Sequence, residues 1–290
     1  MSRHLGRSGR LAAVAIGAAT LSLGSLVLAS PSASSSTLAP RSTSTVLKLN
    51  HFLCYHVVAR GFKPPTNVLL QNWLQPTPFA PTFGTVSTHC NPAVKQVTVN
   101  GAVKTYKIIY PDAHLLCWQI SYKFGARPVY LTNQFGKGVM TTTGGPTSLC
   151  LPSWKKRSGP PNVVKPTAPP NLDHFACYPL APATSKPVFI LPPVVKVADE
   201  FSALRLQSVK IDQPNLLCIP TTKIASGVRY TVHNKNDLSL TCFPITPTTY
   251  WKSFFDENQF GQGELFPTSQ TSSSGGLLEE LCVPTAAHIG

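Results

Sequence analysis

Internal repetition is the feature of this sequence that most limits what it can fold into. The pentapeptide HFLCY at His51–Tyr55 returns as HFACY at His174–Tyr178, 123 residues later. Two more motifs recur at similar distances: NQFG at Asn133–Gly136 and Asn258–Gly261, and LCxP at Leu149–Pro152 and Leu281–Pro284. Because such self-similarity is typical of a chain built from copies of one structural unit, we expect two repeat units, residues 48–157 and 171–286, and a short tail, residues 287–290.

Each unit is itself double, which makes four quarter-repeats. Every quarter has one early and one late cysteine: Cys54 and Cys90, Cys117 and Cys150, Cys177 and Cys218, Cys242 and Cys282. Between the two cysteines lies a short motif of two polar residues, an aromatic residue and usually a small one. Its four copies are Gln71-Asn72-Trp73-Leu74, Asn133-Gln134-Phe135-Gly136, Asp199-Glu200-Phe201-Ser202 and Asn258-Gln259-Phe260-Gly261. We therefore expect an internal pseudo-twofold repeat within each unit.

The combined motifs resemble those of a family of secreted tandem-repeat domains of unknown function, which is marked by HFxCY, then DQFG, then LCxP. The resemblance covers nearly all of residues 48–286, and the first quarter departs from it most, with QNWL in place of DQFG. It implies secretion and a repeat architecture, and it implies no activity.

The N-terminal residues have the pattern of a signal for secretion. Residues 1–29 begin with arginines and continue as an uncharged apolar run that ends in Val27-Leu28-Ala29, as in a secretory signal peptide. An uncleaved membrane anchor is the alternative, because the run is just long enough to span a bilayer. Residues 30–47 are a Ser/Thr/Pro-rich leader, and residues 158–170 are a Pro-rich linker. We expect a secreted, extracellular protein with no transmembrane segment after signal cleavage.

Strand patterns dominate the repeat units. Alternating segments flank Asn100-Gly101, a dipeptide that favours the two-residue turn of a β-hairpin, and Ser226-Gly227 holds the matching place in the second unit. Residues 127–131 and 187–191 are also predicted as strands. With 28 Pro and 19 Gly, the chain is interrupted too often for a helical bundle. The predicted class is all-β, with two tandem antiparallel sandwich- or barrel-like units.

The cysteine spacing favours structural disulfides. Export places the chain in an oxidising compartment, where cysteines pair. No CxxC motif occurs, so we expect no metal site. The simplest connectivity joins the early and late cysteine of each quarter. The rival connectivity joins Cys54 to Cys150 and Cys90 to Cys117, with its equivalent in the second unit.

Three histidines, His51, His114 and His174, each precede an early cysteine by three residues. A metal-ligand role is disfavoured because the fourth copy has Ser239 there, and because residues three apart on a strand point to opposite faces. We expect packed or turn-bonding histidines.

No arrangement of residues indicates catalysis. Residues 48–154 contain a single acid, Asp112, which excludes a two-carboxylate mechanism within the first unit. The adjacent acid pairs of the second unit are expected to be solvated turn residues: Asp199-Glu200, Asp256-Glu257 and Glu279-Glu280. We predict no catalytic residues and no cofactor.

Charge is the one uneven property of the two units. Residues 48–156 hold eleven Lys and Arg against one acid, whereas residues 171–290 hold eight against ten. A basic surface attracts polyanions, so the hypothesis is a secreted, non-enzymatic protein that binds anionic envelope or extracellular glycan polymers, with no specific nucleic acid. The candidate binding residues are Lys95, Lys104, Lys107, Lys123, Arg127 and Lys137. Exposed aromatic residues such as Trp118 would favour glycan binding. The alternatives are an extracellular hydrolase with a site between the units and a purely structural protein.

Overall fold

A computed structural model describes residues 49–99, 101–156, 172–183, 188–233, 238–246, 248, 252–268 and 279–290. These residues form strands and no helix, and the strand pairs are antiparallel, which confirms the all-β antiparallel class. No helix long and apolar enough to cross a membrane occurs in this part of the chain. The expected signal peptide, leader and linker lie outside the described residues.

The strands in chain order are β1 His51–Arg60, β2 Val68–Gln71, β3 Thr82–Val99, β4 Ala102–Tyr106, β5 His114–Ser121, β6 Arg127–Asn133, β7 Gly136–Thr142, β8 Ser148–Lys156, β9 His174–Pro182, β10 Val195–Ala198, β11 Gln207–Val209, β12 Leu216–Ala225, β13 Val228–Tyr230, β14 Leu238–Ile245, β15 Phe254–Asn258, β16 Gly261–Pro267 and β17 Glu279–Ile289.

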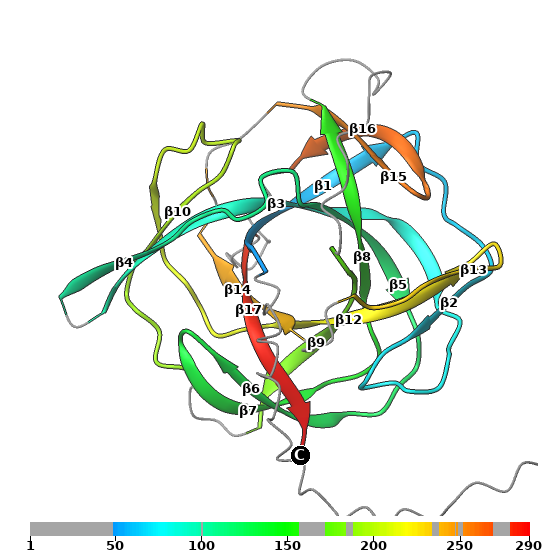
Figure 1. The fold of residues 1–290 in the computed structure, drawn as a ribbon, viewed down its shortest axis with the longest axis horizontal. Helices are drawn as coiled ribbons and strands as arrows, with labels where there is room; N and C mark the ends of the chain where they lie inside the picture. The colour runs from blue at the N-terminus through cyan, green and yellow to red at the C-terminus, as the bar shows by residue number, and fades with distance from the viewer. Residues whose placement is uncertain are drawn as a thin grey trace, which may run out of the picture. The chain divides into compact units, whose positions relative to one another are not determined.

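Eight of these strands pair in a closed cycle, which we call the ring (Figure 1). The early and late strands of the four quarters follow one another as β1, β3, β5, β8, β9, β12, β14 and β17. The cycle closes where β17 pairs with β1, with Phe52 opposite Cys282. Because every ring strand has a partner on both sides, none of them leaves an open edge at the level of the ring.

The two halves of the chain are joined in one sheet, which differs from the expectation of two separate units. The ring is continuous across the halves at β8–β9 and at β17–β1. Each outer strand pairs with the late strand two quarters away: β2 with β12, β6 with β17, β10 with β3 and β15 with β8. All the described residues belong to one compact unit, Thr45–Gly290. Backbone groups of the outer strands are therefore satisfied in part by strands of the other half, which joins the two halves in place of two self-contained sheets.

The repeated motifs follow from the alternation of side chains along the ring strands. Phe52 and Cys54 of the HFxCY motif point into the ring, whereas Leu53 and Tyr55 point out towards the strands that cover it. The interior therefore stacks in layers, with the apolar residues Phe52, Leu115, Phe175 and Leu240 beside a layer of eight cysteines. The small cavity left among them is about 30 Å³, so the ring is a packed core.

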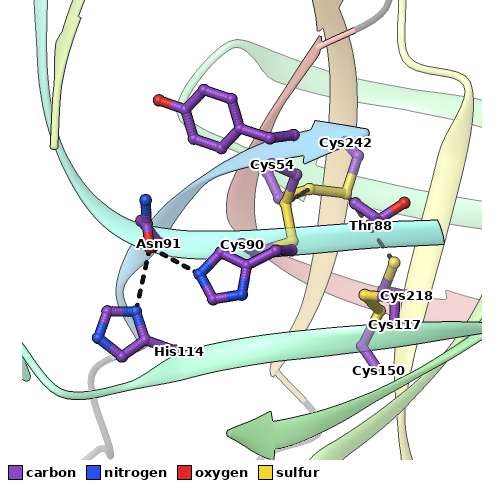
Figure 2. The surroundings of a disulfide bond; sticks show 12 residues. Cys54, Thr88, Cys90, Asn91, His114, Cys117, Cys150, Cys218 and Cys242 are labelled. Atoms are coloured by element: carbon purple, nitrogen blue, oxygen red, sulfur yellow. Dashed lines mark hydrogen bonds between the residues drawn. A yellow bond between two sulfur atoms is a disulfide. The ribbon is translucent and has the colours of Figure 1, made fainter. Parts of the chain in front are cut away.

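The cysteines pair as early with late within each quarter, and the rival connectivity is wrong. The bonds are Cys54–Cys90, Cys117–Cys150, Cys177–Cys218 and Cys242–Cys282, and the described residues include no free cysteine. Each bond joins residues that lie directly opposite on neighbouring strands, such as Cys54 and Cys90 (Figure 2). Sulfur atoms of adjacent disulfides approach to 3.6 Å between Cys54 and Cys282 and to 3.8 Å between Cys150 and Cys177.

The predicted turns are largely confirmed. Gly101 and Gly227 take positive φ angles of 80° and 77° in the two hairpins, β3–β4 and β12–β13. Residues 127–131 lie in β6, as expected. Residues 188–191 lie outside any strand, and Pro187 is not among the described residues. Pro192 and Pro193 follow directly and lack the N–H that a ladder needs, so the strand leading to the third turn is β10.

Candidate functional site

The outward-facing histidines bind the turn motif of the following quarter. His51 Nε2 lies 2.9 Å from Gln134 Oε1, and His174 Nε2 lies 2.6 Å from Gln259 Nε2. Burial, followed by the charge of a nearby lysine, lowers the pKa of both histidines to about 3, so both rings are neutral at neutral pH. The expectation of turn-bonding histidines is confirmed for this pair.

Local hydrogen bonds explain the turn motif itself. In its second and fourth copies the asparagine accepts a backbone hydrogen bond from the aromatic residue, at 2.8 Å from Phe135 N to Asn133 Oδ1 and 2.8 Å from Phe260 N to Asn258 Oδ1. The glycine that follows takes a φ of 127° at Gly136, which favours a residue without Cβ. The turn thereby holds its aromatic side chain against the strands of the eight-stranded ring.

In three quarters, a buried lysine from a ring strand contacts the aromatic residue of a turn motif. Lys95, Lys155 and Lys223 each stand five residues after a late cysteine. Their Nζ atoms lie 4.6 Å from the Phe135 ring, 4.0 Å from the Phe201 ring and 4.5 Å from the Phe260 ring. The sequence analysis missed this contact, although a Cys-x-Pro-x-x-Lys spacing shared by three quarters was available to reveal it.

Two of these lysines have no hydrogen-bond partner among the described residues. Each of these Nζ atoms is buried between two aromatic side chains. The second one is Tyr106 for Lys95, at 4.2 Å, and Tyr230 for Lys223, at 4.3 Å. Burial lowers the pKa of Lys95 to about 6, with a further contribution from Lys104, and burial lowers the pKa of Lys223 to about 7. An ammonium ion without a partner is costly inside a protein, and these pKa values express that cost.

Lys95 is therefore not a surface residue, which corrects its expected place among the polyanion-binding lysines. Its side chain is 0% exposed because β4 and the Phe135 turn cover the face of β3 from which it projects. Trp118, expected as an exposed aromatic residue, is also 0% exposed and packs against Phe62 and Phe83.

Two of the six candidate basic residues line an open groove of about 680 Å³. Lys104 and Lys107 are exposed and flank Tyr106, whose ring also contacts Lys95. His51 and Gln134 line the same groove. Neither exposed lysine forms an ion pair or a hydrogen bond with another described residue. The groove therefore offers two free positive charges beside an aromatic ring.

The remaining candidates are exposed and do not line this groove. Lys123 follows β5, Arg127 begins β6 and Lys137 lies in β7. Arg127 and Lys137 lie near opposite ends of the β6–β7 hairpin, because Arg127 pairs with Thr142 whereas Lys137 pairs with Thr132. The six candidates do not form one patch.

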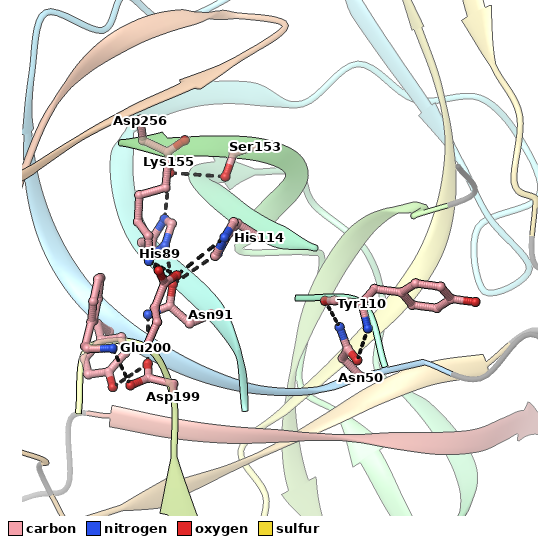
Figure 3. A network of polar contacts seen from close by, with 12 residues as sticks. Asn50, His89, Asn91, Tyr110, His114, Ser153, Lys155, Asp199, Glu200 and Asp256 are labelled. Carbon is pink, nitrogen blue, oxygen red and sulfur yellow. Dashed lines mark hydrogen bonds and ion pairs between the residues drawn. The ribbon is translucent and has the colours of Figure 1, made fainter. Parts of the chain in front are cut away.

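A second cluster of charged residues is buried between ring strands and the strands that cover them (Figure 3). His89 Nδ1 lies 2.7 Å from Asp256 Oδ2, and His89 Nε2 lies 2.9 Å from Asn91 Oδ1. Lys155 Nζ donates to Asn91 Oδ1 at 2.8 Å and also contacts Glu200. The basic groups come from the first half of the chain and the acids from the second, so the charge difference between the halves is partly neutralised here.

The sequence analysis expected solvated turn residues at the acid pairs, and this expectation is wrong for Asp199 and Asp256. Asp199 and Asp256 are 0% exposed, and burial raises the pKa of both despite hydrogen bonds that act in the opposite sense. Neighbouring residues on a strand point to opposite faces, so one member of a pair is buried where the strand is covered. Along β15, Asp256 is the buried member.

The geometry of this ionic cluster is that of a structural tie. Tyr55 donates to Asp199 Oδ2 at 2.9 Å, and Ser153 donates to Asp256 Oδ2 at 3.1 Å. Both hydroxyl groups are buried, and each donates to a carboxylate that is buried with it. Tyr55, Ser153 and His89 belong to the first half of the chain and both acids belong to the second, so the cluster holds the two halves together.

One group of potential metal ligands occurs among the described residues: Cys242, Glu280 and Cys282. Both sulfur atoms belong to one disulfide, so neither is available as a thiolate ligand. This leaves Glu280 as the one available ligand of the group, and Glu280 accepts a hydrogen bond from Asn215 at 3.1 Å.

Comparison with family models, with curated proteins and with solved structures finds no match to this chain. The resemblance to the secreted tandem-repeat family stays an expectation based on its three motifs.

Proposed function

We propose that this chain is a secreted, non-enzymatic, disulfide-stapled β-repeat protein that binds anionic polymers of the extracellular space or cell envelope at the Lys104–Lys107 groove. One observation carries the proposal: two exposed ammonium groups without a described partner flank Tyr106 in an open groove. Four disulfides are consistent with an oxidising, extracellular location.

The chemistry of the groove favours a repeating anion over an uncharged sugar. Lys104 and Lys107 lie three residues apart, on both sides of Tyr106, and a polymer with closely spaced sulfate, phosphate or carboxylate groups meets both at once. The eleven basic residues in residues 48–156 add long-range attraction towards such a polymer. The buried ionic cluster supports a structural tie and lends nothing to a hydrolase.

The test compares two double variants with the same change of net charge. Lys104→Gln/Lys107→Gln removes the groove charges, and Lys63→Gln/Lys123→Gln removes two exposed charges that do not line the groove. Binding of fluorescent dextran sulfate is measured at low salt, where exposed charges are poorly screened. At about 1 kcal/mol for each basic residue near an anionic surface, the groove variant loses about thirtyfold in affinity.

The control variant is expected to lose only a fewfold, through the general drop in charge. Equal losses in the two variants mean that binding is diffuse and that the groove is not a site. No binding by the unmodified protein favours the structural alternative.

A further inference from the structure

We propose that Lys95 is the buried end of the same anion site, and that the groove binds polyanions more tightly as pH falls from about 7.5 to about 5.5 because Lys95 takes up a proton with the anion. This inference deepens the proposed function and rests on it. It assigns a regulatory role to a side chain that no solvent reaches in the structure.

The Tyr106 ring is the wall shared by Lys95 and the groove. Lys95 Nζ lies 4.2 Å from the centre of this ring and Lys104 Nζ lies 5.0 Å from it. The His51 ring, which lines the groove, is centred 4.9 Å from the Tyr106 ring. Both ammonium groups therefore contact the same aromatic ring, and an anion held by Lys104 lies close enough to Lys95 to act on its charge.

In the absence of an anion, burial and the like charge of Lys104 disfavour the protonation of Lys95. Lys104 from β4 is a like charge, His51 from β1 is a neutral base, and Phe135 from the β6–β7 turn is apolar. From the neighbouring strand β10, Val197 pairs with Lys95 and carries no charge. Burial and Lys104 together lower the pKa of Lys95 to about 6, so an anion that neutralises Lys104 raises it again.

The chain contains a matched control for this site. Lys223, Tyr230, His174 and Gln259 repeat the arrangement of Lys95, Tyr106, His51 and Gln134 in the third quarter. Aligned on the two tyrosines, Val228 and Thr231 stand where the groove has Lys104 and Lys107. The third quarter thus has the buried lysine without the exposed pair, and we expect no anion to couple to it.

The experiment measures the affinity for dextran sulfate at pH 7.5 and pH 5.5, because sulfate esters keep their charge over this range. The unmodified protein and Lys223→Met are expected to bind at least about fivefold more tightly at the lower pH, which is the low end of ordinary coupling between sites. Lys95→Met is expected to lose this gain while it still binds at pH 7.5.

Several outcomes separate this inference from the proposed function. A Lys95→Met variant that keeps the full pH gain overturns the role of Lys95, and it leaves the groove as a site. If Lys104→Gln/Lys107→Gln binds as well as the unmodified protein, the proposed function is wrong as well. If Lys95→Met does not fold, calorimetry of the unmodified protein in two buffers of different ionisation enthalpy decides, because proton uptake on binding near pH 6.5 supports the proposal and its absence refutes it.

Discussion

Replacing Lys95 by methionine should make the protein more stable, although the lysine is buried in its core. In the part of the chain that the structure describes, Lys95 Nζ has no hydrogen-bond partner, and it is enclosed by Tyr106 and Phe135. Methionine keeps the length and flexibility of the side chain and forms favourable sulfur–aromatic contacts with the same rings. The variant therefore removes the charge and leaves the packing nearly unchanged.

The magnitude follows from the pKa of the lysine. A pKa of about 6 in the folded protein, against 10.5 for the free side chain, means that the folded state binds the proton less well than the unfolded chain does. At ~1.4 kcal/mol for each pH unit, keeping Lys95 uncharged at pH 7 costs up to ~5 kcal/mol. The neutral amine still packs against both aromatic rings and methionine has to replace those contacts, so we expect Lys95→Met to gain ~1–4 kcal/mol.

The sign of the pH dependence distinguishes this mechanism from improved packing. Between pH 6 and pH 10.5 the unfolded chain holds a proton that folded Lys95 has released, so the stability of the unmodified protein rises with pH. The cost is complete below pH 6 and disappears above 10.5. The advantage of Lys95→Met should therefore be largest near pH 6 and shrink towards pH 10.

Urea unfolding, followed by tryptophan fluorescence at several pH values, measures this difference directly. Lys196→Met is the control, because Lys196 is exposed on the adjacent strand β10 and its loss should change stability by less than ~0.5 kcal/mol. A Lys95→Met variant that is less stable at pH 7, or whose gain does not change with pH, refutes the reasoning.

Two further predictions concern the joining of the halves. Residues 171–290 alone, under oxidising conditions, should not show a cooperative unfolding transition, because β9 and β17 lose their partner strands β8 and β1. A cooperative transition for this fragment would show that the closed ring of strands is not needed for folding. Asp256→Ala should lower stability by ~3–5 kcal/mol in thermal or urea unfolding, since it leaves His89 and Ser153 without their acid. Asp212→Ala, at an exposed position, should cost less than ~1 kcal/mol, and equal losses in the two variants would contradict a structural tie.

Local patterns in the sequence determined the all-β class and the hairpins, and they favoured the early–late pairing of cysteines over its rival. A two-residue turn at Gly101 or Gly227 joins segments that are close in the chain, so its outcome depends on a few neighbouring residues. The early and late cysteines of a quarter lie on adjacent ring strands, and the repeat already placed them in equivalent positions. Motif spacing was sufficient for these features because each is settled within one quarter.

Only the tertiary structure decided which side chains are buried and how the halves combine. Lys95 and Asp256 both belong to strands that alternate between two faces, and the sequence does not say which face a strand from another quarter will cover. For Lys95 the cover is the Tyr106 ring and the Phe135 turn of the next quarter. For Asp256 it is His89 and Ser153, both from the other half of the chain. Hydrogen bonding between distant strands depends on the closure of the whole ring. For this reason Lys95, predicted for the surface, is part of the core. Asp256, predicted for a solvated turn, is part of the tie between the halves.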